Sequence, residues 1–384
     1  MSRSNRVRRT AGLAALGAGA ALAAGWAAQR RLVARSSPTE EDMARAELLL
    51  PPDVEHQDIE MDDGGLIHVV SRGRGQPVVL LHGVFLNSCI WVHQLADLSD
   101  EYRVIAVDLR GHGRSELGAD GFGLKDPIPE DPVGDLLSVP ARIEHAETPE
   151  PSAKRGRTVG RLLRPRRNAP PALDRLARDV RQVLASLEVE RGVLVGHSMG
   201  GMVAVQAVAG LSTEERHHRL SGLVLTSTTT GPFLELPGWD MFAALGAPAA
   251  LRAVRASVRS GRGAIPKGDV RWWASRLAFG AEAPPAQVRF LESMLADADP
   301  RTMEGILEPL ARVNLTSVLG SVDIPALVMV GTHDRLTPPW HSRRLESRLP
   351  DARLVELARC GHMPMLERRR EFDRLLEEHV RKVS

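Results

Sequence analysis

One short stretch of the chain places a serine among glycines directly after a run of β-branched residues. In GVLVGHSMGG, residues 192–201, Ser198 fits the pattern G-x-S-x-G between a strand-like VLV and a helix-like MVAVQAVAG. In that setting such a serine occupies a strained turn that exposes its hydroxyl group. Gly196 and Gly200 allow the backbone to approach closely around the turn. The stretch therefore predicts a nucleophile, with a capped helix start as the alternative.

A serine hydroxyl group is a poor nucleophile without a base, so the chain must also supply a histidine oriented by a carboxylate. In a strand–turn–helix setting the expected chain order is serine, acid, histidine. Asp334 follows the apolar run ALVMVG by three residues, and His362 lies in the loop after RLVEL. Both lie just beyond the ends of strand-like runs and in the expected order. We therefore predict a Ser198–His362–Asp334 catalytic triad.

Asp108 is the alternative acid, because VDLRGHGRS also ends a strand-like run. We interpret Asp108 and Arg110 as structural, since Asp334 occupies the expected loop before the histidine. His197 and His333 are sequence neighbours of the triad, and we expect them to support it rather than to react.

His82 and Gly83 open the segment HGVFLNS, which follows the first strand-like run of a predicted parallel series. A loop in this place is expected to supply main-chain donors for an oxyanion. We assign that role to the backbone amides of Val84 and Met199, the second being the residue after the nucleophile. Because main-chain groups donate, the side chains at these two positions matter little.

The elements that must position these residues are short apolar runs alternating with segments of helical periodicity. Residues 55–71 are typical of a hairpin. The later strand-like runs are 77–83, 103–109, 192–198, 222–227, 326–331 and 353–357, and the helical patterns lie at about 90–100, 173–187, 200–210, 339–348 and 366–382. Such alternation predicts a mostly parallel sheet with helices on both faces.

Two long stretches interrupt this alternation. Residues 116–171 are rich in proline, glycine and charge, and we expect a flexible insert; its basic segment, 154–167, is the alternative candidate for contact with anionic lipid headgroups. Residues 231–322 are helical in pattern and carry half of the aromatic residues. They fall where ligands bind in such sheets, so we predict a helical cap. Its aromatic residues either form its own core or line an acyl pocket.

The N-terminus does not belong to the predicted fold. Four arginines precede residues 11–28, an uncharged segment that contains ten alanines and four glycines. A basic start followed by an apolar segment is typical of a signal peptide or a signal anchor. We expect membrane anchoring or export, with a cytoplasmic protein as the lesser alternative. The predicted units are the signal segment 1–35, a core of 36–230 and 323–384, and the cap 231–322.

The composition excludes several classes of protein. A net charge of +2 gives no basis for nucleic-acid binding, and two cysteines exclude both a disulfide framework and a cysteine-based zinc site. We predict no metal site, and no pattern indicates an oligomeric state.

Five segments in order resemble the α/β-hydrolase family: HGVFLNSCIW, DLRGHGRS, GHSMGG, GTHDRLTPP and CGHMPMLE. The resemblance covers about residues 55–384. It implies an eight-stranded, mostly parallel sheet, a helical cap after the sixth strand, and the Ser198–His362–Asp334 triad without a cofactor. The insert at 116–171 departs from the family by its length, which leaves the loops near the site open.

The fold supports many chemistries, so the function must come from the site. Haloalkane dehalogenases and epoxide hydrolases of this family use an aspartate nucleophile, against which Ser198 argues. Epoxide hydrolases also need cap tyrosines, and the only tyrosine is Tyr102, before the run RVIAVD. We therefore expect a serine carboxylic-ester hydrolase, of the esterase or lipase type, that cleaves a hydrophobic or lipid-like ester through an acyl-enzyme.

Three other activities on the same triad are alternatives: a cofactor-free haloperoxidase-type reaction, C–C hydrolysis and acyl transfer to an alcohol. The segment HMPMLE places a glutamate where some acyltransferases have an aspartate, which weakens the third. A catalytically idle binding module is the alternative of another class.

Overall fold

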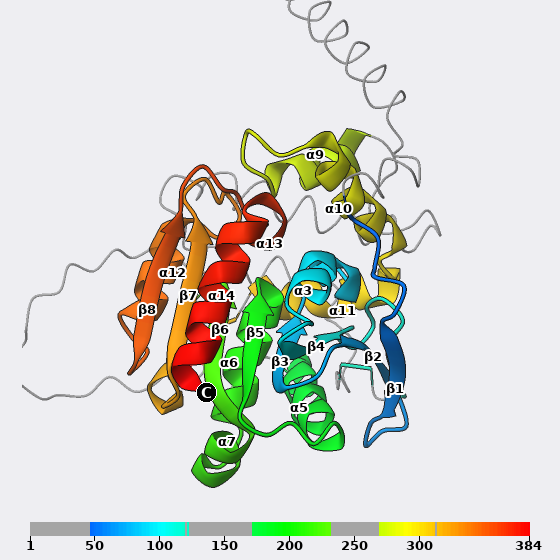
Figure 1. Cartoon of the computed structure of the whole chain (residues 1–384). Helices are drawn as coiled ribbons and strands as arrows, with labels where there is room; N and C mark the ends of the chain where they lie inside the picture. Colours follow the sequence, from blue (N-terminus) through cyan, green and yellow to red (C-terminus); the bar gives the residue numbers. More distant parts are fainter. Residues whose placement is uncertain (1–46, 120, 123–170, 232–268, 312) are drawn as a thin grey trace, which may run out of the picture.

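The structure is a computed structural model that describes residues 47–119, 121–122, 171–231, 269–311 and 313–384. Its centre is an eight-stranded sheet in the order β1-β2-β4-β3-β5-β6-β7-β8 (Figure 1). The strands are β1 (Glu55–Glu60), β2 (Leu66–Arg72), β3 (Gln76–Leu81), β4 (Tyr102–Val107), β5 (Gly192–His197), β6 (Leu220–Thr226), β7 (Ala326–Gly331) and β8 (Ala352–Leu357).

The pairing of the strands confirms the predicted mostly parallel sheet. β1 and β2 form the antiparallel hairpin, and β2 also runs antiparallel to β4. Every later pair, from β4–β3 through to β7–β8, is parallel. The carboxyl ends of β3 to β8 therefore share one edge of the sheet, where ligands bind in open α/β sheets.

Helices cover both faces of the sheet, and each face has its own hydrophobic core. Successive strand residues point to opposite faces. Val78 and Leu80 accordingly pack on one face, while Val79 and Leu81 pack on the other, all four fully buried. The strands β5, β6 and β7 are thus fully buried, whereas β1, at the edge of the sheet, is mostly exposed.

The first core contains α5 (Pro171–Ser186), α6 (Met199–Ala209), η2 (Leu319–Ser321), α12 (Pro339–Glu346) and part of α11 (Pro300–Ala311). The second contains η1 (Ser88–Trp91), α3 (Val92–Asp97), α10 (Pro285–Asp297), α13 (Pro364–Glu367) and α14 (Arg369–Val383), the last on the near face of the sheet in Figure 1. The remaining described helices are α7 (Thr213–Arg219) and α9 (Asp269–Leu277).

The predicted cap is described only in part. Its helices α9, α10 and α11 lie between β6 and β7 in the chain, and α9 and α10 stand beyond the carboxyl edge of the sheet (Figure 1). Phe279 and Phe290 are buried in the second core, next to residues of β8 and α14. These two aromatic residues therefore pack against the sheet domain. The division into domains stays a prediction.

The predicted signal segment 1–35 and residues 123–170 of the insert lie outside the described residues, as do 232–268 of the cap. Within the part of the chain that is described, no helix combines the length and the apolar character that crossing a membrane requires.

A buried ionic network joins the loop after β4 to two other elements. The side chain of Arg110 is inaccessible to solvent and forms ion pairs with Asp63, in the β1–β2 turn, and with Asp179, on α5. Arg175 contacts both of these carboxylates as well. The arginine thus ties the loop that begins at Asp108 to the hairpin and to α5, in keeping with the structural role expected for it.

Replacing Asp179 by alanine should destabilise the fold strongly. Arg110 would keep Asp63 but lose its pair with Asp179, so its buried guanidinium group would be compensated only in part. Breaking a buried ion pair typically costs about 3–5 kcal/mol. We expect a loss of this order in the free energy of unfolding, measured by urea titration. Glu356→Ala is the control, because it breaks the exposed Arg343–Glu356 pair and should leave stability near wild type. Equal stability of the two variants would contradict the role given to Arg110.

Candidate active site

The turn between β5 and α6 holds Ser198 in a conformation that L-residues rarely adopt. Its φ is 52° and its ψ is −119°. Such strain persists only where the surroundings enforce it. Here a Cβ atom on Gly196 would lie 2.5 Å from the carbonyl oxygen of Gly200, and one on Gly200 would lie 2.4 Å from that of Leu81. Both glycines are therefore required by close backbone packing, as the G-x-S-x-G pattern indicates.

The loops after β7 and β8 bring Asp334 and His362 together. Nδ1 of His362 lies 2.9 Å from Oδ2 of Asp334, and both side chains are buried. Thr337 donates to the carboxylate through both its amide, to Oδ1 at 2.8 Å, and its hydroxyl group, to Oδ2 at 2.8 Å. The amide of Leu336 also donates to Oδ1, at 2.9 Å. The carboxylate thus fixes the orientation of the imidazole ring.

Two opposing effects determine the ionisation of Asp334. Burial alone raises the pKa of this carboxyl group. The charge and hydrogen bond of His362 and the donors of Thr337 more than offset burial, so the pKa lies below its usual value. An ionised Asp334 at neutral pH keeps the proton of His362 on Nδ1. Nε2 is then free to accept a proton, as a general base requires.

His197 joins the serine turn to the histidine loop. Its Nε2–H donates to the carbonyl oxygen of His362 at 2.9 Å, and the centroids of the two rings are 4.9 Å apart. Burial lowers the pKa of His197 to about 3, so its ring is neutral. It therefore supports the site without adding a charge beside the base.

The hydroxyl group of Ser198 forms no hydrogen bond with Nε2 of His362 or with any other group of the described residues. In unliganded active sites this bond is often long and tightens only when substrate binds. The structure brings the three predicted triad residues to the same edge of the sheet and joins two of them directly; the role of each stays a prediction.

The loop after β3 lies against the nucleophile turn. A Cβ atom on Gly83 would meet Nδ1 of His197 at 2.9 Å and Cβ of Ser198 at 3.2 Å. The ring of His82 holds this loop, since Nδ1–H donates to the oxygen of Gly83 at 2.7 Å and Nε2 accepts from the amide of Leu109 at 2.9 Å. Burial lowers the pKa of His82 to about 4, which keeps this tautomer neutral.

The two predicted oxyanion donors are the backbone amides of Val84, after β3, and Met199, after β5. Met199 is the first residue of α6, where backbone amides have no partner within the helix. Neither its amide nor that of Val84 donates to another described residue. The helix dipole adds positive potential at Met199. Together these amides can stabilise an oxyanion.

Asp108, the alternative acid, serves another purpose. Its two carboxylate oxygens accept hydrogen bonds from the amides of Ser88, at 2.6 Å, and Arg114, at 2.9 Å. These bonds join the loops after β3 and β4, and they leave no contact with His362. The side chain of His333 is exposed, next to Asp334 in sequence. Among the described residues, no three histidine, cysteine or acidic side chains are grouped so as to hold a metal ion.

Sequence reasoning missed a carboxylate that holds the histidine loop. Oε1 of Glu367 accepts from the amides of Gly361, at 2.9 Å, and Met363, at 3.3 Å, while Oε2 accepts from Gly280 at 2.7 Å. The amide of His362 itself donates to the oxygen of Ala278 at 2.7 Å. The only signal in the sequence was the glutamate of HMPMLE, which by itself does not indicate three backbone partners.

The fold and these motifs match known proteins. The model of the alpha/beta hydrolase fold family matches residues 76–369. The chain therefore belongs to the α/β-hydrolase family.

Individual relatives are distant and cover most of the chain. A pimeloyl-[acyl-carrier protein] methyl ester esterase of Aeromonas hydrophila is 25% identical over 82% of this chain and 99% of its own length. The AB hydrolase superfamily protein YisY of Bacillus subtilis is 22% identical over 83% and 97%. The solved structure of an esterase from Exiguobacterium antarcticum superposes with a TM-score of 0.63 at 21% identity, over 85% of this chain and all of that one.

Replacing Glu367 by alanine should lower turnover more than substrate binding. Its loss frees the loop that carries His362, and a misplaced catalytic group can reduce the rate by about 10²-fold. We expect kcat for p-nitrophenyl acetate to fall by that order with KM little changed. Glu367→Gln, which keeps one acceptor oxygen, should retain more activity. Exposed Glu371 on α14 provides the control, Glu371→Ala; a fully active, folded Glu367→Ala enzyme would contradict this role.

Proposed function

We propose that the protein is a serine carboxylic-ester hydrolase with Ser198 as nucleophile, His362 as general base and acid, and Asp334 as the residue that orients the histidine. The observation that carries the proposal is the buried Asp334–His362 pair, at 2.9 Å, beside a serine in a strained turn at the same edge of the sheet. This is the arrangement that activates a serine hydroxyl group.

In the proposed reaction, Ser198 attacks the ester carbonyl carbon while His362 takes the hydroxyl proton at Nε2. The amides of Val84 and Met199 stabilise the oxyanion, and each such donor is typically worth about 10²–10³ in rate. His362 then gives its proton to the leaving alcohol, and an acyl-enzyme remains. Water, deprotonated by His362, attacks the acyl carbon and releases the acid and the free serine.

For the substrate, we propose a hydrophobic ester. The named relative from Aeromonas hydrophila is a methyl ester esterase whose name specifies an acyl group, and this supports carboxylic-ester chemistry on the same fold. The side chains nearest the oxyanion loop include Phe85 and Leu86, which favour an apolar acyl chain. No cofactor is needed at any step of the reaction.

Labelling with a fluorophosphonate probe tests the nucleophile. We expect the probe to label the wild-type protein and Ser347→Ala, a control at an exposed serine, but not Ser198→Ala. Undiminished labelling of Ser198→Ala would refute the proposed nucleophile.

Asp334→Asn should reduce kcat for an activated ester by about 10⁴, because the amide no longer selects the correct histidine tautomer.

We also propose that the N-terminal segment anchors the enzyme in a membrane, with residues 11–28 as the anchor and the basic segment 154–167 as a second contact with anionic lipids. The combination of a basic start and an uncharged apolar stretch supports this proposal. It would place the esterase near hydrophobic substrates.

Fractionation of cells tests the anchor. The full-length protein should sediment with membranes, while a protein that starts at Ser36 should remain in the supernatant. Replacing the seven lysines and arginines of 154–167 by glutamine tests the second contact separately. If the two lengths of protein partition alike, residues 11–28 are not an anchor.

A further inference from the structure

The carbonyl oxygen of Ser198 is held by a group from outside its own helix. The hydroxyl group of Thr228, in the segment after β6, donates to this oxygen at 2.6 Å. Two amides of α6 donate to the same oxygen, those of Gly201, at 3.0 Å, and Met202, at 3.3 Å. Thr228 thus makes the shortest of these three bonds and the only one of the three that comes from a side chain.

Close packing against α6 holds the side chain of Thr228 in place. The residue is fully buried. A Cβ atom on Gly201 would lie 2.7 Å from Cβ and 2.7 Å from Oγ1 of Thr228, which is too close for real atoms. Position 201 therefore has room only for glycine. The last glycine of GHSMGG, which lies beyond the G-x-S-x-G pattern, is explained by this contact.

One peptide group contains both the carbonyl of Ser198 and the amide of Met199. A peptide group is planar, and in the trans form its C=O and N–H bonds point in opposite directions. The described residues contain no cis peptide bond. The carbonyl points toward Thr228 and into α6, so the amide of Met199 points away from the helix. A group that fixes the direction of the carbonyl therefore fixes the direction of the amide as well.

The bond from Thr228 also affects the strength of the Met199 amide as a donor. Hydrogen bonds that follow one another in a chain polarise each other, most of all in a low dielectric. A donor on the carbonyl oxygen draws electron density through the peptide group and leaves its N–H bond more polar. An amide that is both fixed and polarised stabilises a negatively charged oxygen better.

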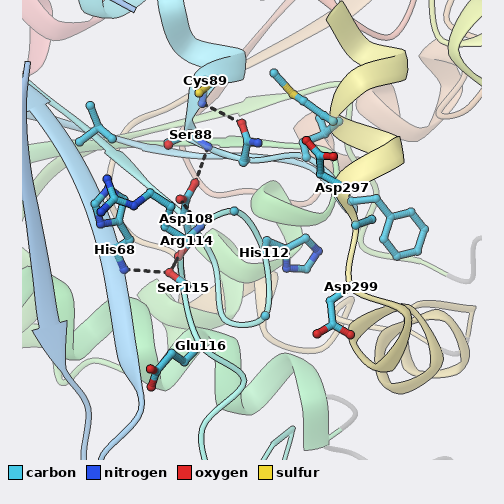
Figure 2. A pocket seen from close by; sticks show the side chains of 18 of the residues that line it. His68, Ser88, Cys89, Asp108, His112, Arg114, Ser115, Glu116, Asp297 and Asp299 are labelled. Carbon is cyan, nitrogen blue, oxygen red and sulfur yellow. Dashed lines mark hydrogen bonds between the residues drawn. The ribbon is translucent and has the colours of Figure 1, made fainter. Parts of the chain in front are cut away.

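The amide of Val84, the other predicted oxyanion donor, is positioned by different groups. His82 bonds to the amide of Leu109, and Asp108 accepts from the amide of Ser88, farther along the loop of Val84, at the wall of the cavity that Figure 2 shows. These two bonds do not involve the turn between β5 and α6. The direction of the Met199 amide is therefore set separately, by the contacts of the carbonyl before it.

We propose that Thr228 is a positioning residue for the oxyanion: its hydroxyl group orients and polarises the amide of Met199 through the peptide group that this amide shares with the carbonyl of Ser198. The inference rests on the proposed esterase function, in which that amide stabilises the tetrahedral intermediate. The oxyanion exists only in the intermediate and the transition states around it. Loss of the hydroxyl group should therefore lower the rate and leave substrate binding unchanged.

Two pairs of side chains at position 228 test this role in the full-length protein. Threonine and Thr228→Val form the first pair, and Thr228→Ser and Thr228→Ala form the second. The members of each pair differ chiefly in the hydroxyl group, and the small members of the second pair fit without crowding the carbonyl of Ser198. With p-nitrophenyl acetate we expect kcat to fall about tenfold within each pair, the usual value of one hydrogen bond, with KM little changed.

Thr226→Val is the matched control, at a buried threonine on β6 whose hydroxyl group has no hydrogen-bond partner among the described residues. It should keep the wild-type kcat. Thr228→Ser should also keep most of it, because it retains the donor. Acylation and deacylation both pass through an oxyanion, so kcat reports the effect whichever step limits the rate.

An alkyl trifluoromethyl ketone measures stabilisation of the oxyanion directly. Ser198 adds to the carbonyl carbon of the ketone, the serine proton passes to His362, and the ketone oxygen becomes the oxyanion of a hemiketal. We expect loss of the hydroxyl group at position 228 to weaken inhibition about tenfold, in step with kcat. The pKa of the hemiketal hydroxyl group, followed by fluorine NMR, should rise, since the anion loses stabilisation.

Equal kcat within both pairs would overturn the inference. A fall in kcat that leaves inhibition by the ketone and the pKa of the hemiketal unchanged would overturn it too, because the hydroxyl group would then act on something other than the oxyanion. Either result leaves the proposed esterase function intact. A wild-type protein that the fluorophosphonate probe does not label would refute the proposed function itself.

Discussion

The site depends on one steric constraint, the left-handed turn at Ser198. A serine at φ 52° is strained, and close backbone packing at Gly196 and Gly200 surrounds the turn. The turn presents the serine side chain at the end of β5 and also starts α6 at Met199, so the first helical amide is left without a partner. The positions of the proposed nucleophile and of one proposed oxyanion donor therefore come from the same backbone conformation.

Buried or half-buried side chains connect the loops around this turn through hydrogen bonds to backbone groups. His82 fixes the loop that carries Val84, His197 binds the carbonyl oxygen of His362, and Glu367 holds the amides on either side of it. Each of these side chains is buried or half-buried. Precision in the site thus comes from polar groups inside the protein, whose hydrogen bonds gain strength in a low dielectric.

The sheet and the placement of the chemistry could be read from the sequence because both have a local signature. Apolar runs mark strands, and parallel strands bring Ser198, Asp334 and His362 to one edge. The role of Glu367 was out of reach, since its partners at Gly280 and Gly361 are joined only by the fold.

The bond from the amide of His362 to the oxygen of Ala278 has a consequence for any exchange of the cap. Ala278 and Gly280 belong to the segment between β6 and β7, which carries the helices of the predicted cap. Yet that segment supplies one hydrogen-bond partner to His362, the proposed catalytic base, and another to Glu367. A transplanted cap must therefore reproduce the backbone of this short turn, whatever its helices contribute elsewhere. The backbone from residue 278 onward therefore belongs to the site and not to an exchangeable part of the cap.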